Sequence, residues 1–293
     1  MRVSKNKLLN LALNCWQSKN IETAIGHIIE FYKGLKYPYR KKRRGSWKWH
    51  FGNFLDCLEN GKFDHYVRVF VCGNSKLPFY SFSTLPQITC PGAGDCLEWC
   101  YSFRAWRYPL AFIRQLQNSL LIKFKPHTVA KHFLSIPSDC DVRLYVDGDF
   151  DSLDTVKFWM KWIRERSDLR VYGYSKSWNE LIEFSKNNEF PTNYVLNVSS
   201  GSKHDTETKK QIERLPISRG QFVAVKIDTE GIGKGSNRYN QKEYHARVRN
   251  ALRNEYGTNK VFSCPGRCGE CTLSGHACGN MKANNVVIGI GVH

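Results

Sequence analysis

The segment VRLYVDGDFDSLDTVKFWMKWIRERSDLRVYGYSKS, residues 142–177, predicts the fold. It opens with a run of β-forming residues at 142–146 and closes with another at 170–174. Between these runs, apolar residues recur at helical spacing: Val156, Trp159, Met160 and Ile163. A strand, a helix and a second strand in this order form one β/α unit, and such units build parallel sheets.

Further strand-like runs extend the pattern along the chain. They are VRVFVC (67–72), NYVLNVS (193–199), QFVAVKI (221–227) and VVIGIGV (286–292). From residue 142 to residue 227 the strands recur every roughly 25–30 residues, as expected of β/α repeats. Polar residues gather just after strands, which favours a partial or complete β/α barrel-like core over residues 65–293. An open parallel sheet has the same pattern and stays an alternative.

Residues 1–60 predict a separate, small helical extension with a strongly basic character. The chain has 44 Lys and Arg against 26 Asp and Glu, a net charge of +18. Residues 1–60 contain 12 of these cations and 4 of the acids, a net +8. A balance this basic favours a polyanionic partner, most commonly nucleic acid.

The segment LKYPYRKKRRGSWKWHF, residues 35–51, interleaves seven Lys and Arg with five aromatic residues. Pro38 and Gly45 interrupt it, so we expect an arm and not one continuous helix. Because cations neutralise phosphates and aromatic rings stack on exposed bases, the arm predicts contact with DNA or RNA. The predicted contact residues are Arg40, Lys41, Lys42, Arg43, Arg44, Trp47, Lys48 and Trp49. The alternative is a charged linker with scattered core aromatics.

The cysteine usage indicates metal binding inside a cell. No apolar run approaches the roughly 18 residues of a membrane helix. The N-terminal stretch reads as an amphipathic helix and not as a signal peptide. We therefore expect a cytoplasmic protein, in the host cytoplasm if a phage encodes it, without a membrane partner. In that reducing compartment, eleven cysteines predict metal ligands or chemistry and not disulfides.

The first cysteine motif is ITCPGAGDCLEWCYSFRAWR, with Cys90, Cys96 and Cys100 separated by five and three residues. Its proline and glycines form a turn that allows the backbone to approach an inorganic core. Three thiolates on one loop can bind three irons of a 4Fe-4S cluster and leave the fourth iron open. Downstream, residues 96–124 are expected to contain a long helix.

The second motif is FSCPGRCGECTLSGHACGN, with Cys264, Cys268, Cys271 and Cys278 within fifteen residues. Four thiolates this close predict a metal site. Their irregular spacing favours an iron–sulfur cluster over zinc, whose knuckles usually contain two close pairs, but zinc stays an alternative. The two motifs serve either one cluster or two.

Carboxylates and other polar groups follow successive strands. Asp147 and Asp149 come directly after the strand at 142–146, where barrel enzymes place catalytic groups. They are the candidate catalytic residues, and the alternative is turn and helix-capping chemistry. Tyr174, Ser175 and Lys176 end the next strand, and Asn197, Ser199 and Ser200 end the one after it. Polar groups at successive strand ends are expected to converge on one pocket mouth, and ordinary loop chemistry is the alternative.

As a set, CPGAGDCLEWCYSFRAWR, VRLYVDGDFDSLDTVKFWMKWI, RVYGYSKS and the closing CPGRCGEC loop resemble the phage "gene product 88" domain family. The resemblance covers roughly residues 67–292 and leaves out the basic N-terminal extension. It implies a phage or plasmid origin and a cysteine-ligated cluster, and it implies no settled activity.

A second likeness is to radical S-adenosylmethionine enzymes, which combine a three-cysteine loop with a partial β/α barrel. Their usual spacing is three and two residues, whereas Cys90, Cys96 and Cys100 are spaced by five and three. The leading hypothesis is an iron–sulfur protein that binds nucleic acid, with a structural or redox-sensing cluster. The alternatives are a radical S-adenosylmethionine enzyme with an open iron and a zinc-stapled nucleic-acid-binding module.

Overall fold

The computed structural model of the protein describes residues 3–37, 44–73, 77–233, 238, 241–269, 271 and 275–292. The α-helices are α1 (Lys5–Gln17), α2 (Ile21–Lys33), α3 (Trp47–Glu59), α4 (Pro109–Phe124), α5 (Pro126–Leu134), α6 (Leu153–Glu165), α7 (Trp178–Ser185), α8 (Thr206–Glu213) and α9 (Lys242–Tyr256). Short 3₁₀ helices are η1 (Asp95–Leu97), η2 (Tyr101–Arg107), η4 (Ala277–Gly279) and η5 (Met281–Ala283). The strands are β1 (Val71–Cys72), β2 (Tyr80–Ser81), β3 (Asp141–Leu144), β4 (Arg170–Ser175), β5 (Tyr194–Ser199), β6 (Ser218–Lys226), β7 (Val261–Ser263) and β8 (Val287–Val292).

The strands form one eight-stranded sheet in the order β1-β2-β3-β4-β5-β6-β8-β7. Every neighbouring pair is parallel except β1 and β2. The predicted α/β fold is thus confirmed. The described ladders run in one line from β1 to β7, an arrangement compatible with the partial barrel, and they do not confirm a closed one.

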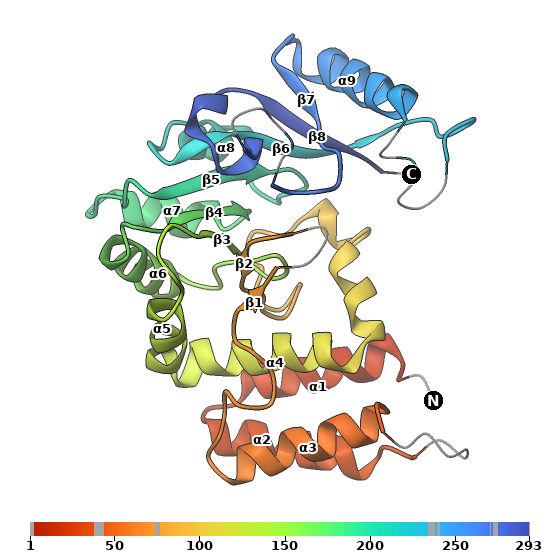
Figure 1. Cartoon of the computed structure of the whole chain (residues 1–293), viewed down its shortest axis with the longest axis vertical. Helices are drawn as coiled ribbons and strands as arrows, with labels where there is room; N and C mark the ends of the chain where they lie inside the picture. The colour runs from red at the N-terminus through yellow and green to blue at the C-terminus, as the bar shows by residue number, and fades with distance from the viewer. Residues whose placement is uncertain are drawn as a thin grey trace.

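Strands that follow one another in chain order place their crossover helices on one face of the sheet, because parallel crossovers share one hand. Figure 1 shows α5, α6 and α7 on one side of the strands. Val142, Val171 and Leu196 point to this side and join a hydrophobic cluster with helix residues. Alternate residues such as Tyr172 and Val195 lie in a second cluster on the opposite, inner face.

Aromatic rings fill the core between the sheet and the helices. Trp159 of α6 is fully buried, and its ring lies 5.1 Å from that of Phe82 and 5.6 Å from that of Phe133. Its indole N–H donates to the Tyr145 hydroxyl at 2.8 Å, so the buried polar atom is satisfied. This residue therefore joins α5, α6 and the sheet into one core.

The predicted helical N-terminal region is also present, as α1, α2 and α3. Leu8, Phe51 and Phe54 from these helices share a hydrophobic cluster with Phe112 and Leu116 of α4. The opposite side of α4 contributes to the core under the sheet. The N-terminal helices therefore pack directly on the core region, and their description as a separate module stays a prediction (Figure 1).

The long helix expected within residues 96–124 is present as α4, but it begins only at Pro109. Pro109 occupies the first turn of α4, where its missing N–H costs nothing, and the chain before it forms the 3₁₀ helix η2. Residue Tyr108, which precedes the proline, is extended, as steric clash with the proline ring requires. The proline thus separates the cysteine loop from α4.

Replacement of Trp159 by alanine tests the core directly. We expect Trp159→Ala to lower the free energy of unfolding by about 3–5 kcal/mol, because it leaves a cavity and an unpaired Tyr145 hydroxyl. The matched control is Lys157→Ala on the exposed face of the same helix, expected to change it by less than about 0.5 kcal/mol. Urea unfolding measures both, and equal effects would contradict this packing.

Candidate functional site

The first cysteine loop, residues 90–100, is fastened to the carboxyl edge of the sheet. The N–H of Gly94 donates to the carbonyl of Gly201 at 3.0 Å, and the N–H of Lys203 donates to the carbonyl of Gly92 at 3.1 Å. Gly201 and Lys203 lie in the loop after β5. The cysteine loop is therefore held where the parallel strands end, which is the edge that carries active sites in β/α folds.

The three thiols of this loop share one neighbourhood. Burial raises the pKa of Cys90 and Cys96, and the charge of Asp149 raises that of Cys90 further. Cys100 lies close enough to interact electrostatically with both. The ammonium of Lys176 acts in the opposite direction and favours both thiolates. The first cysteine loop thus brings three thiols into the neighbourhood of the Lys176 ammonium group.

Asp149 connects the ends of β3 and β4 beside this loop. Its carboxylate is 4% exposed and accepts hydrogen bonds from Ser175 Oγ at 2.7 Å and from the N–H groups of Lys176 at 2.7 Å and Phe150 at 2.9 Å. Burial raises its pKa, and these hydrogen bonds offset part of the rise. Because both oxygens have donors, Asp149 is suited to positioning the two strand-end loops.

Asp147 lies at the same edge but has other partners. Gln115 Nε2 donates to its Oδ2 at 2.9 Å, and Ser102 also bonds the carboxylate. Burial is the main influence on its pKa, which is raised. Asp151, in contrast, accepts from Thr155 Oγ1 at 2.7 Å in the first turn of α6. Of the two candidate catalytic carboxylates at the carboxyl edge, Asp149 is therefore buried and Asp147 half-buried, and both lie apart from the acid at the helix start.

The predicted convergence of strand ends is confirmed by one hydrogen bond. Lys176 Nζ, after β4, donates to Ser199 Oγ, at the end of β5, at 2.9 Å. His204 also belongs to this region, because its Nε2 lies 3.1 Å from the Lys176 carbonyl and its ring stacks on Trp178. Sequence reasoning missed His204, and only its position shortly after a strand could have indicated it.

The second cysteine loop, between β7 and β8, packs on the inner face of the sheet. Cys264, Cys271 and Cys278 join the inner hydrophobic cluster with Tyr172. Asn197 Nδ2, from β5, donates to the Cys278 carbonyl at 2.8 Å. Loop and sheet are thus connected through a fully buried amide.

Two backbone N–H groups of the second cysteine loop donate hydrogen bonds to its sulfur atoms. The N–H of Gly266 donates to Cys264 Sγ, and the N–H of Ala277 donates to Cys271 Sγ, both at 3.4 Å. Burial raises the pKa of Cys264 to about 12 and that of Cys278 to about 11. Without a bound cation these thiols therefore stay protonated at neutral pH, and metal binding would release their protons.

Buried positive charge surrounds the second loop. Arg219 is fully buried, its Nε donates to Asn197 Oδ1 at 2.8 Å, and its charge lowers the pKa of Cys278. Arg143 lies 4.5 Å from the centre of the Tyr174 ring and interacts electrostatically with Cys268. Cationic side chains of this kind favour an anionic group between the loop and the sheet.

The seven cysteines of the two loops are the side chains that would hold an iron–sulfur cluster, because thiolates are its usual ligands. In the described part of the chain, no three His, Cys, Asp or Glu side chains converge on one ion position. In a cubane each thiolate binds a different iron, and sulfur reactivity is tuned by N–H donors such as those of the second loop. The buried Arg143 Nε and Tyr172 hydroxyl have no hydrogen-bond partner among the described residues.

The predicted nucleic-acid contacts divide into three groups. Arg40, Lys41, Lys42 and Arg43 lie outside the described residues. Arg44 is exposed and lies 6.0 Å from the Trp49 ring, whereas Lys48 donates to the carbonyl of Leu35 at 2.8 Å. Trp47 is only 7% exposed and packs on Phe51, so most of its ring belongs to the core.

Together these features define a cysteine-rich α/β protein whose candidate sites lie at the carboxyl edge and on the inner face of a parallel sheet. The family model for "Gene product 88" matches residues 59–282, so the chain belongs to the gene product 88 family. This confirms the phage family expected from the sequence, and the match begins after the N-terminal helices. No curated protein and no solved structure matches the chain. None of the described helices is long and apolar enough to cross a membrane.

Gly92 tests the docking of the first cysteine loop. A Cβ atom at Gly92 would lie 1.6 Å from the Lys176 carbonyl oxygen, so Gly92→Ala must displace the loop. We expect Gly92→Ala to lower the free energy of unfolding by about 1–3 kcal/mol. Gly26→Ala is the control, because nothing lies within 4 Å of its Cβ and helix α2 accepts alanine. Urea unfolding that shows no difference between the two variants would contradict the docked loop.

Proposed function

We propose that this chain is an iron–sulfur enzyme of the radical S-adenosylmethionine type, with an open-iron 4Fe-4S cluster held by Cys90, Cys96 and Cys100. The observation that carries the proposal is the position of the three-cysteine loop. Hydrogen bonds fasten it to the carboxyl edge of a parallel, barrel-like sheet, beside Asp149 and Lys176. A cluster with a purely structural role could lie anywhere in the fold, whereas active sites of β/α folds lie at the carboxyl edge of the sheet.

When bound, such a cluster would supply one electron to the sulfonium of S-adenosylmethionine. The residues of the chain would bind and orient the substrate. Lys176, held by Ser199, offers positive charge to the sulfurs and to a substrate carboxylate. Asp149 fixes the loops after β3 and β4 in one position. The geometry therefore provides binding and orientation before any chemistry.

Cys264, Cys268, Cys271 and Cys278 are proposed to hold a second, fully ligated cluster on the inner face. Buried Arg219 and Arg143 would compensate its negative charge, and the N–H groups of the loop would bond its sulfurs. A zinc ion on the same four thiolates is the alternative occupant of this site.

A nucleic-acid partner is the second part of the proposal. The net charge of +18 and the interleaved cations and aromatics of residues 35–51 support it. The leading hypothesis from the sequence was a nucleic-acid-binding protein with a structural or redox-sensing cluster. The position of the first cysteine loop at the carboxyl edge of the sheet favours an enzymatic reaction in addition to nucleic-acid binding.

The reaction is tested by incubating the anaerobically purified, reduced protein with S-adenosylmethionine and measuring methionine release. We expect release by the unmodified chain and loss of at least about 100-fold in a Cys90→Ser, Cys96→Ser, Cys100→Ser variant, because the open iron would be absent. Cys57→Ser, outside both motifs on α3, is the matched control and should keep the activity. An iron-loaded protein that neither binds nor cleaves S-adenosylmethionine would sink the enzyme proposal and leave a structural or redox cluster.

A further inference from the structure

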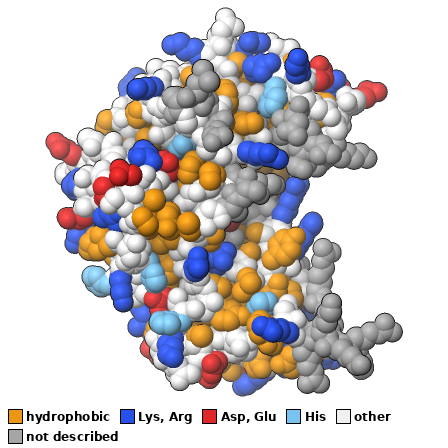
Figure 2. Space-filling model, viewed as in Figure 1, with side chains coloured by type: hydrophobic (Ala, Val, Ile, Leu, Met, Phe, Trp, Pro, Cys, Tyr) orange, Lys and Arg blue, Asp and Glu red, His pale blue; other side chains and the backbone are white. Residues whose placement is uncertain are grey.

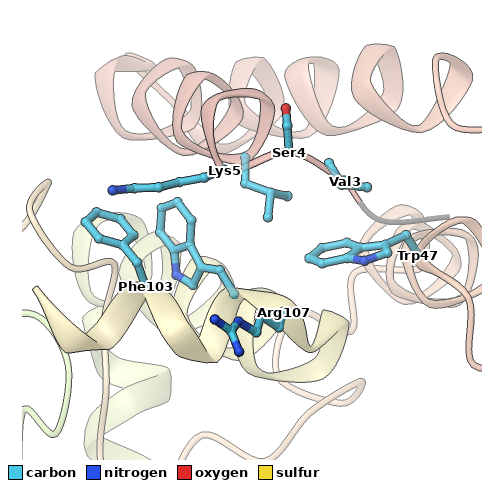
Figure 3. Close-up of a pocket in the computed structure, with 8 residues that line it drawn as sticks. Val3, Ser4, Lys5, Trp47, Phe103 and Arg107 are labelled. Atoms are coloured by element: carbon cyan, nitrogen blue, oxygen red, sulfur yellow. The ribbon is translucent and has the colours of Figure 1, made fainter.

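A cavity of about 390 Å³ lies where the first turns of α1 and α3 meet η2, on the far side of α4 from the helix-covered face of the sheet. Its volume falls within the usual range of small-ligand sites, roughly 300–1,000 Å³. Figure 3 shows Trp47 and Phe103 on opposite sides of the cavity, with Lys5 and Arg107 at its margins. Three separate segments of the chain thus bring aromatic rings and cations to one hollow.

The aromatic walls are fixed before any ligand binds. Trp106 is 3% exposed, its indole N–H donates to Gln115 Oε1 at 2.7 Å, and its ring meets Phe112 edge-on at 4.9 Å. Trp47 stacks on Phe51 at 6.1 Å. Trp47 and Trp106 are almost fully buried and form the ordered floor of the cavity, so the ring that a flat ligand can contact is the half-buried Phe103. An ordered floor keeps the loss of side-chain entropy on binding small.

The margins of the cavity are positive. Lys5 Nζ lies 3.7 Å from the centre of the Phe103 ring, and Arg107 is exposed. Neither forms an ion pair within the described residues. Helices α1 and α3 also begin here, each capped by a serine and each without an acidic residue in its first turn. Cations and two positive helix ends therefore favour a phosphate at the rim of an aromatic cavity.

An exposed strip leads from this cavity to the first cysteine loop. The strip consists of η2 with Cys100 before it and Tyr108 after it. The seven residues of η2 span about 14 Å at about 2.0 Å per residue. Tyr101 is 54% exposed, Tyr108 is 67% exposed, and Arg104 lies on the surface between them. Cys100 immediately precedes the helix. Figure 2 shows the molecule indented on one side between its upper and lower parts, with Lys and Arg side chains around the indentation.

We infer that the cavity and the η2 strip bind single-stranded nucleic acid, with one unstacked base at the mouth of the cavity beside Phe103 and its phosphate at Lys5 and Arg107. The exposed tyrosines of η2 then stack the following bases toward Cys100. A duplex keeps its bases paired and cannot insert one into the cavity without first unstacking it. The inference rests on the proposed function, and it makes a polynucleotide strand the substrate of the site beside the cysteine loop.

The test is fluorescence anisotropy with a labelled oligothymidylate added to the full chain in the absence of S-adenosylmethionine, at several salt concentrations. The test variant is Lys5→Glu with Arg107→Glu. The matched control is Lys157→Glu with Lys186→Glu, which makes the same charge change on the exposed faces of α6 and α7. We expect the test variant to weaken binding at least about tenfold and to reduce the salt slope by about 0.7, because the one phosphate held by Lys5 and Arg107 is released from a single strand. The control should keep at least half of the affinity.

Equal weakening in both variants would overturn the inference and show that net charge alone attracts the oligonucleotide. Stronger binding of a duplex of the same length, or equal competition by polyglutamate, would also overturn it. Quenching of tryptophan fluorescence by the oligonucleotide, lost in the test variant, would support the base position. A chain that binds the strand as expected but releases no methionine would refute the proposed reaction alone, and the reverse result would refute this inference alone.

Discussion

The fold depends on one constraint of parallel sheets, that strands joined in chain order carry their helices on the same face. The uninterrupted order from β2 to β6 places α6, α7 and α8 on that face, around Trp159. Within the described residues, the opposite face is covered by the second cysteine loop with its 3₁₀ helix η4 and not by these α-helices. The two cysteine loops lie where these α-helices do not, the first at the carboxyl edge and the second on the opposite face.

Buried positive charge beside the second cysteine loop supports the proposal of an anionic occupant. Burying a guanidinium is costly unless its donors are satisfied and its charge is balanced. Arg219 meets the first condition, since it donates to Asn197 Oδ1 and to the carbonyls of Ala283 and Val286. Arg143 does not, because its buried Nε has no partner among the described residues. A cluster with net negative charge between these side chains would satisfy the second condition for both.

Local patterns predicted strands β3 to β6 and β8 and helix α6, whereas α5, α8 and β7 were not predicted. Asp147, Asp149, Lys176 and Ser199 could be placed at one edge because parallel strands share a direction, and the Lys176–Ser199 hydrogen bond confirms that placement. The start of α4 was not predicted, although a proline such as Pro109 favours the first turn of a helix. Local patterns could not show whether an aromatic side chain belongs to the core or to a binding surface. Trp47 looked like a stacking residue, and only tertiary packing shows that most of its ring belongs to the core.

The central claim is that the two cysteine sets hold separate iron–sulfur clusters, and metal analysis after separate removal of each set tests it most directly. Iron and acid-labile sulfide are measured in the anaerobically purified chain, in a variant with serine at the three cysteines of residues 90–100, and in one with serine at the four cysteines of residues 264–278. The account predicts about eight irons and eight sulfides in the first protein and about four of each in either variant. A chain with one zinc and no sulfide, or a single set whose removal abolishes all iron while the other changes nothing, would contradict it.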